Sequence, residues 1–130
     1  MSSYVIRQAK VLGDKVADVA IEDGVITEIG KDLTIAGATE VDAKGLVALP
    51  GLVDLHTHVR EPGREDAETV LSGSKAAARG GFTCVHAMAN TDPVADTAGI
   101  VEQVWHLGRA AGYVDVQPTG AVTVGLKGTA

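Results

Sequence analysis

Two histidines separated by a single residue, His56 and His58, are the clearest candidates for chemistry in this sequence. They follow a short apolar segment, Leu52–Leu55, which is typical of a β-strand. Residues i and i+2 of an extended chain point to the same side, whereas in a helix they diverge. Imidazole is also the commonest metal-binding side chain near neutral pH. The alternative is two histidines in a surface loop, but their place after an apolar strand and before Arg60 favours a metal site.

Arg60 and Asn90 are candidates for binding an anionic substrate. Arg60 continues the alternation of the histidines, and the planar fork of its guanidinium suits a carboxylate. Asn90 follows the next predicted strand and could donate and accept hydrogen bonds to an amide-like ligand. The alternative for Asn90 is the turn chemistry of the sequence Asn-Thr-Asp-Pro. The alternative for Arg60 is an ion pair with one of three nearby acidic residues, Glu61, Glu65 or Asp66.

The other polar or reactive residues are predicted to have structural roles. Asp54 lies in the strand before His56, where it either orients an imidazole or is a satisfied buried carboxylate. Four further residues are assigned to structure and packing: His86, His106, Cys84 and Trp105.

Composition limits the possible partners of the chain. Of its 130 residues, 45% are hydrophobic, which is enough to form a core. Only 3% are aromatic, so that core must be aliphatic. The net charge of −6 argues against binding to nucleic acid or to an anionic membrane. No apolar run approaches the ~18 residues that a membrane helix needs, and no secretory signal is visible. The single cysteine fits a reducing compartment, so we expect a cytoplasmic protein.

Residues 1–50 are predicted to form a small antiparallel β module. Short apolar segments alternate there with turn residues every few positions. Asp23-Gly24 lies between two apolar runs and is a strong hairpin signal, because both residues tolerate positive φ.

The pattern changes at Pro50-Gly51, and residues 51–130 are predicted to alternate strands and helices. This order implies parallel strands joined by crossover helices, whose carboxyl ends meet at one edge of the sheet. The expected elements are a strand at Leu52–His56, a helix at Ala67–Arg79, a strand at Phe82–Ala87, a helix at Thr97–Ala111 and a third strand at Tyr113–Gln117.

Several stretches of this sequence resemble the dihydroorotases, a family of the amidohydrolase superfamily. Pro50–Gly63, read as PGLVDLHTHVREPG, resembles the superfamily's metal signature, and its His-x-His-x-Arg-Glu-Pro-Gly form resembles dihydroorotase in particular. Met88–Pro93 resembles the motif Met-Pro-Asn-Thr-x-Pro, with Ala89 in the place of the usual proline. Three shorter stretches also resemble the family: Glu65-Asp66 with Glu68-Thr69, Ser72-Gly73 and Ala76–Thr83. The resemblance therefore spans essentially the whole chain.

The resemblance implies an α/β fold: the N-terminal part of a metal-dependent (β/α)8 TIM barrel, preceded by the β module. It implies one or two zinc ions in the full-length active site, with His56 and His58 as metal ligands. Arg60 and Asn90 would hold the carboxylate of dihydroorotate or N-carbamoyl-L-aspartate. The reaction would be the reversible cyclisation of N-carbamoyl-L-aspartate to dihydroorotate in de novo pyrimidine biosynthesis.

The chain departs from the family in its length. A barrel of this type needs about 250 residues, and these 130 end just after the third predicted strand. The family's bridging carboxylate, later histidines and late-strand catalytic aspartate would lie beyond this chain. We therefore expect this chain to be the N-terminal portion of a dihydroorotase and to be inactive alone. Its expected partner is the remaining C-terminal part of the enzyme. A homo-oligomer or a complex with aspartate transcarbamoylase is a further partner that the resemblance suggests.

Two other functions stay open. A hydantoinase-, dihydropyrimidinase- or allantoinase-like cyclic amidase would use the same metal, but it should lack Arg60 and Asn90. A non-catalytic dihydroorotase-like scaffold for aspartate transcarbamoylase would typically have lost the metal histidines, and both His56 and His58 are present.

Overall fold

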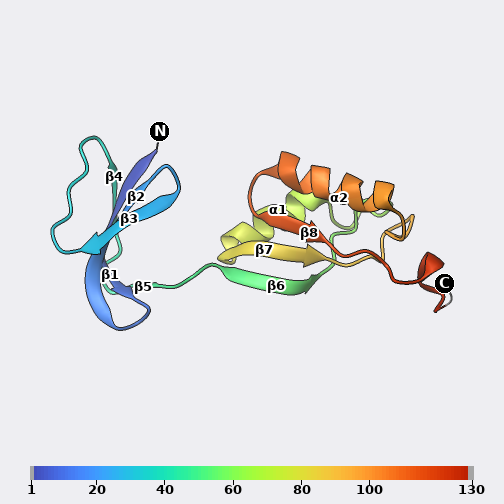
Figure 1. Cartoon of the computed structure of the whole chain (residues 1–130), viewed down its shortest axis with the longest axis horizontal. Helices are drawn as coiled ribbons and strands as arrows, with labels where there is room; N and C mark the ends of the chain where they lie inside the picture. Colours follow the sequence, from blue (N-terminus) through green and yellow to red (C-terminus); the bar gives the residue numbers. More distant parts are fainter. Residues whose placement is uncertain (1, 129–130) are drawn as a thin grey trace. The chain divides into compact units, whose positions relative to one another are not determined.

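The structure is a computed structural model that describes residues 2–128. The chain divides into two compact units, Met1–Pro50 and Gly51–Ala130. The first unit is built from strands alone, and the second alternates strands with helices (Figure 1). No helix within residues 2–128 is both long enough and apolar enough to cross a membrane.

The first unit is a five-stranded sheet with the order β3-β2-β1-β4, in which the short strand β5 also pairs with β1. β1 pairs antiparallel with β2, and β2 pairs antiparallel with β3. The predicted hairpin is confirmed, because Asp23 and Gly24 join β2 to β3 with φ angles of 49° and 81°. The strands are β1 (Ser3–Val11), β2 (Lys15–Glu22), β3 (Val25–Gly30), β4 (Thr39–Asp42) and β5 (Val47–Ala48).

The prediction of an antiparallel module is wrong for the last two strands. β4 and β5 both run parallel to β1, so the sheet is mixed. A tight turn joins only antiparallel neighbours, whereas parallel neighbours need a long connection. Residues 12–38 supply that connection, because they contain β2 and β3 and carry the chain from one side of β1 to the other.

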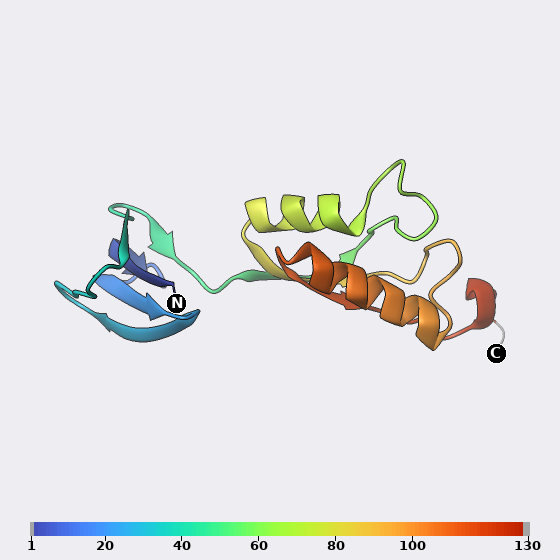
Figure 2. The same ribbon diagram turned by 90° about the horizontal axis from the view of Figure 1, so that it is seen from above.

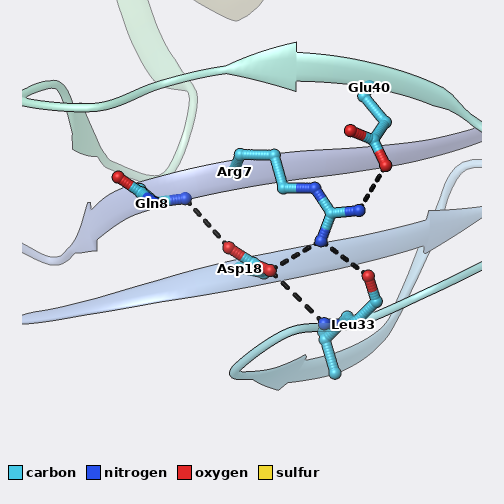
Figure 3. Close-up of polar contacts among 5 residues, drawn as sticks. All are labelled: Arg7, Gln8, Asp18, Leu33 and Glu40. Atoms are coloured by element: carbon cyan, nitrogen blue, oxygen red, sulfur yellow. Dashed lines mark hydrogen bonds and ion pairs between the residues drawn. The ribbon is translucent and has the colours of Figure 1, made fainter.

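An ionic network surrounds the buried Asp18 in this unit (Figure 3). Its carboxylate accepts hydrogen bonds from the Gln8 N–H (3.0 Å), the Arg7 guanidinium (2.8 Å) and the Leu33 N–H (3.3 Å). Arg7 also donates to the Leu33 carbonyl at 2.6 Å and pairs with Glu40. The Gln8 N–H and the Arg7 guanidinium hold the pKa of Asp18 below its ordinary value. The network fixes a β-bulge in β1, where Gln8 has a φ of 57°.

The second unit is a parallel three-stranded sheet, β6-β7-β8, with both helices on one face (Figure 2). This confirms the predicted alternation of strands and crossover helices. The buried residues between sheet and helices are aliphatic: Val59, Val70, Val85, Ala87, Val104, Val114 and Val116. The elements are β6 (Leu52–Thr57), α1 (Val70–Arg79), β7 (Phe82–Ala87), α2 (Ala98–Ala111), β8 (Asp115–Pro118) and a short 3-10 helix, η1 (Val124–Leu126).

Two element boundaries in the second unit differ from the sequence prediction by more than one residue. Helix α1 begins at Val70 rather than Ala67, because Thr69 and Ser72 form a reciprocal capping box at its start. The N–H of Ala67 bonds instead to the carbonyl of Arg64, in a turn that precedes the helix. Strand β8 begins at Asp115, two residues later than predicted. Neither shift moves the residues that follow the carboxyl ends of β6 and β7.

Candidate active site

The paired histidines lie side by side at the carboxyl end of β6. His56 is the second-last residue of the strand, and His58 follows directly after it. Their ring centroids are 5.0 Å apart, with the planes inclined at 70°. Both side chains are exposed, so solvent or a ligand can reach both imidazoles. The backbone here is held to the next strand by a bond from the Met88 N–H to the Thr57 carbonyl at 2.9 Å.

Asn90 reaches across from the segment after β7 to the second histidine. Its Oδ1 lies 2.9 Å from Nδ1 of His58. An amide oxygen only accepts hydrogen bonds, so Nδ1 of His58 must carry the proton. The lone pair of this imidazole is then on Nε2, so that nitrogen is free to bind a metal ion. The Nδ2 of Asn90 makes no hydrogen bond within residues 2–128 and is available to a ligand.

The turn after Asn90 is closed by the Thr91 hydroxyl rather than by the Asn90 side chain. Thr91 donates from its hydroxyl to the Pro93 carbonyl at 2.8 Å. The Asn90 side chain is therefore committed to His58 and not to the local turn, so the turn-chemistry alternative does not describe its contacts in this structure.

Arg60 has no ion-pair partner within residues 2–128. Its half-buried side chain follows the buried Val59, and it makes no hydrogen bond to the histidines or to Asn90 among these residues. The ion-pair alternative for Arg60 is not supported, because the acidic side chains proposed as its partners are engaged elsewhere. Glu61 accepts from the Val70 N–H at 2.8 Å, Glu65 accepts from the Gly63 N–H at 2.9 Å, and Asp66 pairs with Arg64 at 3.4 Å.

Asp54 supports the backbone of the site rather than an imidazole ring. Its Oδ1 accepts a hydrogen bond from the main-chain N–H of His56 at 2.9 Å. That bond is the main cause that lowers the pKa of the Asp54 carboxyl. The carboxylate therefore stays ionised and fixes the chain direction just before the two histidines.

The residues assigned to structural roles stand apart from this group. His86 is half-buried in β7. Cys84 lies in the same strand, where its own burial raises the pKa of the thiol and keeps it a poor nucleophile. The predicted packing role of Trp105 is only partly met, because the residue is 39% exposed. Its ring contacts His106 and the Arg109 guanidinium on the outer side of α2.

The described residues bring together two potential metal ligands, His56 and His58. Within residues 2–128, no three His, Cys, Asp or Glu side chains are grouped closely enough to hold one ion. Catalytic zinc usually has three protein ligands. His56 and His58 therefore provide two donors of the right chemistry, and a third would have to come from elsewhere.

Comparison with known proteins identifies the family. A family model described as dihydro-orotase-like matches residues 45–130, about two thirds of the chain. The chain belongs to the dihydroorotase-like family. The matched range includes His56, His58, Arg60 and Asn90, the residues that surround the carboxyl ends of β6 and β7.

Curated dihydroorotases are similar to this member of the family along nearly its whole sequence. The dihydroorotase of Streptomyces coelicolor is 65% identical over 128 residues, which cover 98% of this chain and 30% of the relative. That of Mycobacterium tuberculosis is 56% identical over 128 residues, covering 97% of this chain and 30% of the relative. The chain thus spans about a third of the length of the curated relatives that it matches.

Solved structures show the same fold in a related group. The L-hydantoinase of Arthrobacter aurescens superposes with a TM-score of 0.78 at 23% identity, covering 95% of this chain and 28% of that protein. At that identity the likeness establishes the fold alone. This dihydroorotase-like chain therefore has the fold of the corresponding part of that L-hydantoinase.

Proposed function

We propose that this chain carries the first part of the active site of a dihydroorotase, which reversibly cyclises N-carbamoyl-L-aspartate to dihydroorotate. The observation that carries the proposal is the contact of Asn90 with His58 at the common end of β6 and β7. It joins a candidate metal ligand to a candidate substrate ligand, although the two residues follow different strands.

His56 and His58 fit a zinc ion by their chemistry. Both are exposed imidazoles at one strand end, and the proton on Nδ1 of His58 leaves Nε2 of that ring to bind metal. When bound, zinc would polarise the scissile amide carbonyl and activate water for ring opening. The part of this chain is to hold two ligands at a fixed spacing, with the backbone of His56 anchored by Asp54.

Arg60 and Asn90 would bind the substrate carboxylate. Arg60 has a guanidinium without an ion-pair partner in the described residues, and Asn90 has its Nδ2 available. A guanidinium fork and an amide N–H both donate to carboxylate oxygens. Hydantoin and dihydrouracil lack this carboxylate, so these two residues favour dihydroorotate as the substrate.

The rest of the barrel would come from residues beyond this chain. On β6, Val53 is 55% exposed and Leu55 is 69% exposed, although both are aliphatic strand residues. Aliphatic strand side chains pack in layers inside a (β/α)8 barrel, which needs eight strands to close. The remaining part of the enzyme would cover this surface and supply the third metal ligand and the aspartate that moves the proton. A second copy or aspartate transcarbamoylase is a further proposed partner of the whole enzyme.

The test is a substrate panel on the full-length protein that contains these residues. We expect ring opening of dihydroorotate and ring closure of N-carbamoyl-L-aspartate, with hydantoin and dihydrouracil turned over far more slowly. Arg60→Gln should remove most of the preference for dihydroorotate, because the variant loses the charge that recognises the carboxylate. A preference of the wild-type protein for hydantoin or dihydrouracil would overturn the proposal.

A further inference from the structure

The segments that follow β6 and β7 touch each other through their backbones. The N–H of Asp92 donates to the carbonyl of Pro62 at 3.0 Å. Beside this bond, Gly63 lies directly against the backbone of Asp92. Gly63 is three residues after Arg60, and Asp92 is two residues after Asn90. The contact therefore joins the segment that carries Arg60 to the segment that carries Asn90, the two candidates for binding the substrate carboxylate.

Only glycine fits at this contact. A Cβ built on Gly63 would lie 2.6 Å from Cβ of Asp92 and 2.8 Å from its carbonyl carbon, with the carbonyl oxygen closer still. Gly63 also has a φ of 102°, a conformation that side chains with a Cβ rarely adopt. The obstacle is mainly backbone, so a rotamer change at Asp92 cannot relieve it. A larger residue at position 63 must push the two segments apart.

The segment after β6 is pinned on both sides of this contact. Glu61 accepts a hydrogen bond from the N–H of Val70, the first residue of α1, at 2.8 Å. The N–H of Arg64 donates to the carbonyl of Arg60 at 2.9 Å. The backbone of Arg60 is thereby tied to the same short loop that Gly63 presses against Asp92. A displacement of Gly63 would be transmitted to Arg60 through these bonds.

We infer that Gly63 is a positioning residue, whose close backbone contact with Asp92 sets the spacing between Arg60 and Asn90 for the substrate carboxylate. The inference rests on the proposed function for the identity of that ligand. Gly63 is not proposed to touch the substrate, so it would affect substrate binding only through the positions of the segments after β6 and β7. The histidines precede the loop and are held through Asp54 and Met88, and Asn90 is itself bonded to His58. The displacement therefore falls on Arg60, which shares the loop with Gly63, so metal binding should depend on Gly63 much less than substrate binding does.

The experiment compares Gly63→Ala with Gly81→Ala in the full-length protein. Gly81 is the matched control because its φ of 83° imposes a similar backbone strain, yet a Cβ there meets nothing within 4 Å. We expect Gly63→Ala to raise the KM for dihydroorotate about ten- to a hundredfold, with kcat and zinc content changed by less than about twofold. Gly81→Ala should leave the KM near the wild-type value. Equal KM values for the two variants would overturn the inference.

Two further measurements separate this inference from the proposed function and from a folding defect. Amide exchange of Asp92 should be slow in the wild-type protein and in Gly81→Ala but fast in Gly63→Ala, whatever the substrate is. Unchanged Asp92 exchange in Gly63→Ala would refute the contact itself, whereas a wild-type protein inactive on dihydroorotate would refute only the proposed function. Should Gly63→Ala not fold, Asp92→Ala replaces it. In that variant the backbone contact is kept, so Asp92 amide exchange should stay as slow as in the wild-type protein, and fast exchange in the wild-type protein itself would overturn the inference.

Discussion

Replacing Asn90 with alanine should weaken both metal binding and substrate binding in the full-length enzyme. The proposed site gives Asn90 two separate uses: Oδ1 accepts from Nδ1 of His58 at 2.9 Å, and Nδ2 would donate to the substrate carboxylate. Asn90→Ala removes both groups at once. Arg60→Gln removes only a substrate contact, so the two variants should differ in their metal affinity.

The magnitude follows from the two hydrogen bonds that are lost. Removing the partner that orients a metal-binding histidine typically costs about 10- to 100-fold in metal affinity. A hydrogen bond to a charged group contributes about 1.5–3 kcal/mol, which corresponds to roughly 10- to 150-fold in substrate affinity. Asn90→Ala should therefore lose about one to two orders of magnitude in each quantity, measured independently.

Asn90→Asp separates the two uses of the residue. Its carboxylate still accepts from Nδ1 of His58 and should keep zinc affinity close to that of the wild type. It has no N–H to donate and it repels an anionic substrate, so its KM for dihydroorotate should rise at least as far as that of Asn90→Ala.

The assay combines zinc titration against a competing chelator with steady-state kinetics on dihydroorotate at saturating zinc. The reasoning is refuted if Asn90→Ala binds zinc as tightly as the wild-type protein, because the contact with His58 would then have no bearing on the metal. It is also refuted if Asn90→Asp loses zinc as readily as Asn90→Ala.

Three further outcomes follow from the structure. Arg60→Lys should lower kcat/KM for dihydroorotate at least about tenfold with zinc content unchanged, because a point charge does not replace a bidentate fork; an unaltered kcat/KM would show that Arg60 is structural. Asp18→Asn should cost about 2 kcal/mol in urea unfolding at neutral pH. Because the Gln8 N–H and Arg7 lower the pKa of Asp18, its stabilisation is present above the ordinary pKa of about 4 and is lost as the pH falls through the lowered value. The acid dependence of unfolding should therefore be shallower in Asp18→Asn than in the wild type, and parallel pH profiles would contradict this assignment. Residues 1–130 expressed alone should associate, bind zinc weakly and fail to turn over dihydroorotate; a monodisperse, zinc-loaded, active monomer by light scattering, metal analysis and assay would contradict the barrel proposal.

The second unit was largely predictable because its signals are local. A short apolar strand, two amphipathic helices and the glycines that end them define each element within a few residues of sequence. The parallel order then places the residues after β6 and β7 at one edge of the sheet, which is why the sequence predicts Asn90 near His58; their hydrogen bond was not predicted. The start of α1 was missed because it depends on the capping box of Thr69 with Ser72 rather than on apolar periodicity.

The features that the sequence did not reveal depend on contacts between distant segments. The parallel pairing of β4 and β5 with β1 is decided by a long connection, on which local turn signals say nothing. The ion-pair alternative for Arg60 finds no support in the described residues, where Glu61 accepts instead from the N–H of Val70. The contact of Gly63 with Asp92 was likewise hidden, because it joins two loops that are far apart in the sequence.

The central claim is that His56 and His58 bind the metal that dihydroorotate turnover requires, and zinc analysis of histidine variants tests it most directly. The control is His106→Ala, which removes an exposed histidine from the outer side of α2. We predict that the full-length wild-type protein and His106→Ala hold stoichiometric zinc and are active on dihydroorotate. His56→Ala and His58→Ala should lose zinc and activity together. Full zinc content in either of these two variants would contradict the account.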